Sequence, residues 1–157
     1  MKLPKLDVWV LSAPESLCVD VNSALAEIGL SGIWKIQPVA IGNYQLRVSK
    51  NSNELDTTTL ASKLQRIGVI AELELPVRGG FQRYLVHPAL GVCRQELDEA
   101  GEVLLRSGAV QALLEQSAGS AYEFKRLLRK LDGTLWLDLL EPYRQSSQKI
   151  TLLNRVG

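Results

Sequence analysis

The sequence predicts an α+β protein with two lobes: a ferredoxin-like βαββαβ lobe over residues 1–79, and a lobe of a β-hairpin and short helices over residues 80–157. The main observation is the order of patterns between residues 8 and 76, where strand-like and helix-like segments follow one another as β-α-β-β-α-β. A second observation is that the apolar period becomes helical beyond Ser107. We expect the two lobes to pack as one compact unit.

The first strand and the helix after it form the most specific stretch of the chain. Residues 8–11 are a short run of apolar, β-favouring side chains, which is typical of a strand covered on both faces. Ser12 is predicted to cap the helix, with Glu15 reaching back to its amide and Pro14 in the first turn. Apolar residues recur at helical spacing until Gly29. A helix N-terminus at this place can bind an anion, but a well-capped structural helix is the favoured explanation.

Two further strands are predicted before the second helix. Residues 33–39 read as a strand, and Pro38, which lacks an N–H donor, indicates an edge position. Residues 44–48 alternate between apolar and polar side chains, the pattern of a half-buried strand. Tyr44 is in phase with the apolar positions, so we expect it in the core. An RNA-recognition face would need exposed stacking aromatics on such a strand, which weakens that interpretation.

The second helix and the fourth strand complete the first lobe. The helix is predicted to start at a cap among residues 56–58 and to stop at Gly68. Residues 71–75 alternate between apolar and acidic side chains and therefore predict a half-buried strand. Glu72 and Glu74 fall on its polar side, where we expect them to face solvent.

The second half is predicted to begin with strands and to continue with helices. Residues 82–86 predict a strand beside the fourth, and residues 92–97 with 102–105 predict a hairpin closed by a tight turn. Short helices are expected within residues 110–140, ending at a proline. Residues 150–153 predict a last strand.

Composition narrows the possible functions. The chain has 157 residues, of which 46% are hydrophobic and 22% charged, and its net charge of +1 argues against a dedicated binder of duplex nucleic acid. No apolar run approaches membrane-spanning length, so we expect a cytoplasmic protein. Cys18 and Cys93 are too few for a disulfide framework and are expected to be reduced and buried. One histidine, His87, cannot form a multi-histidine metal site, and neither a metal nor another cofactor is expected.

Catalytic signatures are not found in the sequence. Neither a glycine-rich phosphate loop nor a nucleophile motif is present, so we expect a protein that is not an enzyme and name no catalytic residue. The best candidate for a functional patch is Trp136 with Glu141 and Arg144, an aromatic, a carboxylate and a guanidinium close in sequence. A structural role, with the tryptophan in the core and a Glu–Arg pair fixing the chain, is the favoured explanation of these residues. A pocket between the lobes would also involve Ser12 and His87.

A second candidate is a basic patch on a predicted helix. Lys125, Arg126, Arg129 and Lys130 form two pairs at i, i+4 spacing on one side of that helix. They can meet phosphate or an acidic partner. Acidic residues flank them, however, and a solvated helix face is the commoner explanation.

Short motifs along nearly the whole chain carry a family resemblance. They are Ser12-Ala13-Pro14 followed by Leu17-Cys18, Trp34, Gln37-Pro38, Leu90-Gly91, Leu140-Glu141-Pro142-Tyr143-Arg144 and Asn154-Arg155-Val156-Gly157. In order and spacing they resemble an actinobacterial family of unknown function, the domain-of-unknown-function family numbered 3145. Its members carry a histidine before Ser-Ala-Pro where this chain has Leu11, a Trp-Asp segment where it reads Trp136-Leu137-Asp138, and a longer loop near Gly79. The resemblance implies no activity, and a general-base role for that histidine does not carry over.

Three functions remain open at this point. The sequence favours a non-enzymatic cytoplasmic binding or protein-interaction module that forms a homodimer. The alternative is a small-molecule-binding protein or enzyme with a pocket between the lobes. Weak nucleic-acid binding through the basic patch comes third.

Overall fold

A computed structural model describes residues 3–156 and the side chains of residues 3–145. The strands of this range are β1 (Lys5–Pro14), β2 (Lys35–Ile36), β3 (Asn43–Asn51), β4 (Ile70–Val77), β5 (Gly80–His87), β6 (Gly91–Asp98) and β7 (Val103–Leu104). Its helices are α1 (Glu15–Ala26), α2 (Glu54–Ile67), α3 (Ser107–Ser117), α4 (Ala121–Leu131) and α5 (Thr134–Val156). All strands join one antiparallel sheet in the order β2-β3-β1-β4-β5-β6-β7. The predicted α+β class is confirmed.

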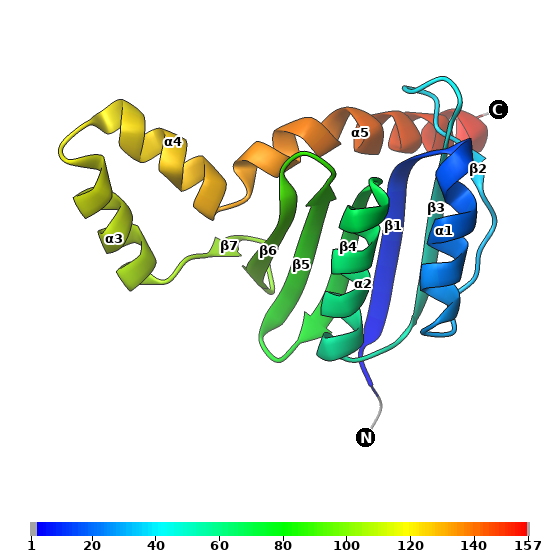
Figure 1. Cartoon of the computed structure of the whole chain (residues 1–157), viewed down its shortest axis with the longest axis horizontal. Helices are drawn as coiled ribbons and strands as arrows, with labels where there is room; N and C mark the ends of the chain where they lie inside the picture. Colours follow the sequence, from blue (N-terminus) through cyan, green and yellow to red (C-terminus); the bar gives the residue numbers. More distant parts are fainter. Residues whose placement is uncertain (1–2, 157) are drawn as a thin grey trace.

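The sheet is covered on both faces, but unequally (Figure 1). Helices α1 and α2 lie on one face and cover the middle of the sheet, where they enclose the larger core cluster. Helix α5 crosses the other face near one end of the strands and encloses a smaller cluster around Leu140. The rest of that second face has no helix over it in this view.

Strand β1 is an interior strand, between β3 and β4, and contributes to both core clusters. Val8 and Val10 belong to the cluster under α1 and α2, whereas Trp9 and Leu11 belong to the cluster under α5. This alternation confirms the prediction of a strand covered on both faces. An irregularity after Val10 shifts the register, so that Ala13 returns to the larger cluster.

The sheet continues without interruption through the expected lobe boundary. Strands β4 and β5 pair from Ala71 opposite Val86 to Val77 opposite Gly80, and residue 79 lies in the turn between them. Strands β6 and β7 form the predicted hairpin, although β7 has only two residues. Strand β2 lies at the edge, as Pro38 indicated, and it is likewise shorter than predicted.

Both predicted helix caps are wrong. Helix α1 begins after Pro14, with no side-chain cap in the described chain, because β1 extends as far as Pro14 and Ser12 is still part of the strand. Ser12 Oγ instead accepts a hydrogen bond from Asn43 Nδ2 at 2.7 Å. Helix α2 is capped by Asn53, whose Oδ1 accepts from the Asp56 amide at 2.8 Å. Its predicted end at Gly68, which has a φ of 101°, is confirmed.

Other expectations were also wrong. Helix α5 runs through Pro142 and continues over residues 150–153, where a strand was predicted. Short apolar runs do not distinguish strand from helix by period alone, and the helix here is the continuation of one already formed. Tyr44 is half-buried and lies outside both core clusters, because the shifted register pairs it with Ala13 near the strand end.

Helices α3 and α4 form a hairpin that stands away from the sheet at its β7 edge (Figure 1). We call these two helices the arm. Their apolar side chains pack mainly against each other. In the described part of the chain, α4 has no buried residue and Ser117 is the one buried residue of α3.

Candidate functional site

Helix α5 brings two of the predicted binding residues together. Arg144 Nη1 donates a hydrogen bond to Glu141 Oε2 at 3.2 Å, one helical turn away. Arg144 Nε also lies 3.1 Å from Glu72 Oε2 on β4. Trp136 lies nearer the start of α5, packs in the smaller core cluster, and donates from Nε1 to the Gly91 carbonyl at 3.1 Å. The pair therefore ties α5 to the sheet, and the tryptophan anchors the same helix.

The other two predicted binding residues lie elsewhere. Ser12 is buried at the end of β1 against Asn43. His87 ends β5, and its Nδ1 accepts a hydrogen bond from the Ala89 amide at 3.1 Å. Burial lowers the pKa of His87 below its ordinary value, so the ring is neutral at pH 7. The hollow that Arg144 lines does not include either residue.

Arg144 lines a small hollow between the sheet and α5, which we call the charged hollow. Its volume is about 140 Å³. The lining side chains come from three neighbouring strands and one helix: Asp7, Trp9, Arg47, Glu72, Glu74 and Arg144. Five of these six residues carry charge, and both signs are present.

Glu72 is the most deeply buried of these charges, with 7% of its surface exposed. The expectation that it faces solvent is wrong, because α5 crosses the polar side of β4 and places Arg144 over it. Burial raises the pKa of Glu72, and the cations of Arg144 and then Arg83 oppose that rise. Glu72 Oε1 lies 3.9 Å from Arg83 Nη1. Although Glu72 Oε2 and Arg144 Nε are close, their orientation makes no hydrogen bond, and neither atom has another partner in the described chain.

Arg47 and Trp9 form the opposite wall. The Arg47 guanidinium lies 4.7 Å from the centre of the Trp9 ring, and its Nη2 donates to Asp7 Oδ2 at 2.7 Å. Together these contacts fix an exposed arginine at the mouth of the hollow. Glu74 is half-buried, and no ion pair or hydrogen bond reaches its side chain from the described residues.

Sequence reasoning did not find this cluster. The signal available was that charged residues stand at alternating positions with apolar ones on the side of β1, β3 and β4 away from α1 and α2: Asp7, Arg47, Glu72 and Glu74. A single strand with that pattern indicates a solvated face. Only the pairing of Trp9 with Arg47 and with Glu72 across the sheet reveals the group.

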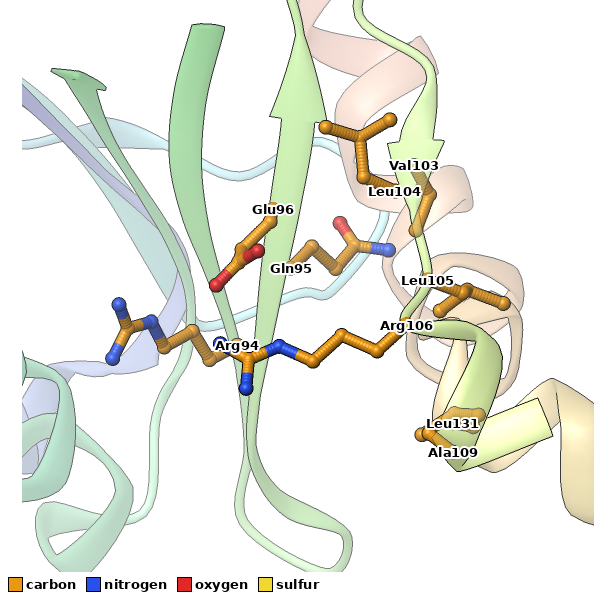
Figure 2. A pocket seen from close by; sticks show the side chains of 9 residues that line it. All are labelled: Arg94, Gln95, Glu96, Val103, Leu104, Leu105, Arg106, Ala109 and Leu131. Atoms are coloured by element: carbon orange, nitrogen blue, oxygen red, sulfur yellow. The ribbon is translucent and has the colours of Figure 1, made fainter. Parts of the chain in front are cut away.

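A second hollow of about 330 Å³ lies where the arm leaves the sheet. Figure 2 shows its lining, and we call it the arm-base groove. The residues are Arg94, Gln95, Glu96, Val103, Leu104, Leu105, Arg106, Ala109 and Leu131. Its apolar side chains come mainly from β7 and the start of α3, and the Arg106 side chain extends towards Arg94 on β6 (Figure 2).

The predicted basic patch lies on α4 and is partly neutralised. Arg126 pairs with Glu123 one turn earlier, and Arg129 pairs with Asp138 on α5. Lys125 and Lys130 are exposed. The patch is therefore a partly paired and solvated helix face.

Both cysteines are free thiols. Cys93 is buried in the smaller core cluster, as expected, whereas Cys18 is only half-buried. Burial raises the pKa of each thiol, with Asp132 adding to the effect at Cys93 and Glu15 at Cys18. Low reactivity follows at neutral pH, because the thiolate is the reactive form.

The described residues contain neither a candidate metal site nor a helix that could span a membrane. No group of three or more His, Cys, Asp or Glu side chains in that range could hold a metal ion. Among the same residues, each helix is too short or too polar to cross a bilayer.

Comparisons with known proteins identify one family. Neither the curated proteins nor the solved structures contain a match to this chain. The sequence model of one family, described as a protein of unknown function (DUF3145), matches residues 7–155. That match covers nearly the whole chain, so the protein belongs to this family, in agreement with the motifs read from the sequence.

Proposed function

We propose that the protein is a self-associating interaction module in which two copies pack their arms antiparallel to form a homodimer. The main support is the incomplete burial of the apolar side chains of the arm. Its two amphipathic helices pack against each other and, at the base of α4, against α5, and their apolar side chains stay partly exposed. Helices of this kind gain stability when a second pair completes a four-helix bundle.

Exposed apolar side chains gather at both ends of the arm. At its tip, the turn between the two helices, Leu114 is 49% exposed and Tyr122 is 79% exposed. At its base Leu104 is 52% exposed and borders the arm-base groove with Leu105. An antiparallel partner would bring the tip of one copy to the base of the other. Leu114 or Tyr122 has a size that suits the groove of about 330 Å³.

The charges of the arm favour the same arrangement. Residues 114–124 at the tip contain two acidic side chains, Glu115 and Glu123, and no basic one. The base, residues 104–109 and 128–132, contains three basic side chains and one acidic one. Tip and base are therefore complementary, and a two-fold axis would repeat each contact twice.

Two opposite charge changes test this dimer. Glu115→Lys makes the tip basic, and Arg106→Glu makes the base acidic. We expect wild-type protein to show twice the chain mass of 17.3 kDa in light scattering after gel filtration, and each variant alone to show the monomer mass. An equimolar mixture of the two variants should recover the dimer mass, because each tip then meets a base of opposite sign.

Helix stability cannot explain such a loss. Glu115 lies in the last turn of α3, where a cation interacts favourably with the helix dipole, and Arg106 is its N-cap, where an anion does. Lys63→Glu, which reverses a charge on α2 away from the arm, is the matched control and should remain dimeric. A monomeric wild-type protein, or variants that stay dimeric alone, would contradict the proposal.

We also propose that the first part of the chain is a ferredoxin-like unit. Strands β2-β3-β1-β4 are adjacent in that order, with α1 after β1 and α2 after β3 on the same face of the sheet. This order supports a ferredoxin-like unit over residues 5–77, from which the remaining strands extend the sheet. The two free thiols support a reducing compartment such as the cytoplasm.

A further inference from the structure

We propose that the charged hollow binds a small zwitterion carrying one ammonium group and one carboxylate, the chemistry of a free α-amino acid. This site is separate from the arm and does not depend on the dimer. Three observations support it: charges of both signs line the hollow, some buried polar atoms there make no hydrogen bond, and the hollow is small.

The register of the sheet places charges of both signs around the hollow, where Arg47 pairs with Asp7 and Arg144 with Glu72. Trp9 lies opposite Arg47 on β3 and opposite Glu72 on β4. Two residues earlier on β1, Asp7 lies opposite Glu74 on β4. Glu72 and Glu74 on β4 therefore lie on one side of the hollow and Arg47 on β3 on the other, with Asp7 of β1 between them and paired to Arg47. Arg144 enters from α5 beside Glu72.

Several polar groups of the hollow can form further hydrogen bonds. Glu72 Oε2 and Arg144 Nε are buried and make no hydrogen bond to the described residues, although they lie 3.1 Å apart. Glu74, two residues from Glu72 on the same strand, receives no ion pair or hydrogen bond from the described residues. Buried polar atoms that make no hydrogen bond, even when an ion pair lies beside them, are rare and call for an explanation. A ligand that both donates and accepts would satisfy both kinds of atom.

Ligands of a single sign fit the hollow poorly. A phosphate or sulfate would meet the three carboxylates of Asp7, Glu72 and Glu74 at close range. A bare cation would meet the guanidinium groups of Arg47 and Arg144. A zwitterion can direct its ammonium group to Glu72 and Glu74 and its carboxylate to the two arginines.

The size of the hollow limits the ligand further. A volume of about 140 Å³ equals roughly four or five water molecules at about 30 Å³ each. Glycine, alanine and serine are of this size, whereas a dipeptide or a nucleotide is not. The ligand class is therefore a small α-amino acid.

Titration of the dimeric or monomeric full chain with L-alanine, followed by NMR, tests the proposal. Trp9 lines the hollow, so its Nε1–H resonance reports on binding there. We expect a saturable shift with a Kd of about 1 mM or tighter. Acetate and methylammonium, each holding half of the zwitterion, should bind at least about tenfold more weakly.

Variants then locate the binding. Glu74→Gln should weaken L-alanine binding at least about tenfold while leaving the fold intact, because no ion pair or hydrogen bond from the described residues reaches the Glu74 side chain. Glu102→Gln, the same change on an exposed carboxylate outside the hollow, should bind as wild type. The proposal is overturned by the absence of a saturable Trp9 shift up to the solubility of L-alanine. Equal binding of acetate or methylammonium, or unchanged binding by Glu74→Gln, would overturn it as well.

Discussion

Helices α2 and α4 have similar apolar periodicity but very different surroundings. In α2 the side chains of Leu60 and Leu64 are fully buried against the sheet. In α4 the equivalent Leu127 and Leu128 are only half-buried, because α4 packs mainly against α3 and α5 and not against the sheet. The pattern in the sequence shows which side of a helix is apolar, whereas the layer opposite decides how much of that side is removed from water.

The same contrast applies to charges. Glu72, which the sequence places on a polar face, is buried beneath α5. Glu123 on the arm is held by Arg126 at the surface. Burial and ion pairing therefore act in opposite directions on two glutamates of one chain.

The largest expected effect compares two leucines. Leu64→Ala should reduce the free energy of unfolding by about 3 kcal/mol, because it leaves a cavity in a fully buried site. Leu128→Ala in the arm should reduce it by less than about 1 kcal/mol, since the side chain is already half in water. Urea denaturation of both variants measures the difference. Equal losses would show that the arm is packed as tightly as the sheet.

The next effect compares two arginines in ion pairs. Arg144→Ala should cost about 2 kcal/mol, because it removes the nearest cation from buried Glu72 and leaves only Arg83 close by. Arg129→Ala, which breaks an exposed pair with Asp138, should cost less than about 0.5 kcal/mol. Urea denaturation at pH 7 checks both values. A loss at Arg144 no greater than at Arg129 would exclude a structural clamp at α5.

The pH dependence of stability should have opposite signs for the two glutamates. The raised pKa of Glu72, caused mainly by burial, means that its contribution is full below about pH 4.3 and is lost as pH rises through the folded pKa. The lowered pKa of Glu123, caused by Arg126, means that its contribution is present above about pH 4.3 and is lost as pH falls. The free energy of unfolding of wild type, Glu72→Gln and Glu123→Gln, measured from about pH 3 to about pH 7, gives the contribution of each glutamate. The advantage of wild type over Glu72→Gln should shrink towards neutral pH, and its advantage over Glu123→Gln should shrink towards acid. Parallel curves for the two variants would contradict this assignment.

The smallest effect concerns the turn of the arm. Ala118 ends α3 with a φ of 49°, the left-handed region that disfavours side chains. Ala118→Gly should therefore stabilise the protein by about 0.5–1 kcal/mol. Ala112→Gly, in the interior of the same helix, should instead cost about 1 kcal/mol. Thermal melts of both variants should move in opposite directions, and a loss for both would show that the turn carries no strain.

Much of the fold was predictable because it depends on local pattern. The alternation in residues 44–48 and 71–75 and the apolar run at residues 8–11 identified β3, β4 and β1. Gly68 fixed the end of α2 because its φ of 101° suits glycine alone. The predictions that failed were those that depend on where one element stops, as at Ser12, or on whether a helix already begun continues, as at residues 150–153.

The sequence by itself determined the α+β class, the burial of the first strand on both faces and the family to which the chain belongs. Only the tertiary structure decided that Glu72 is buried, that Arg144 reaches it, and that Trp9 and Arg47 complete the charged hollow. These residues lie far apart in the chain, and their meeting depends on strand register and on the path of α5. Periodicity is a property of neighbours in sequence, whereas a site is formed by neighbours in space.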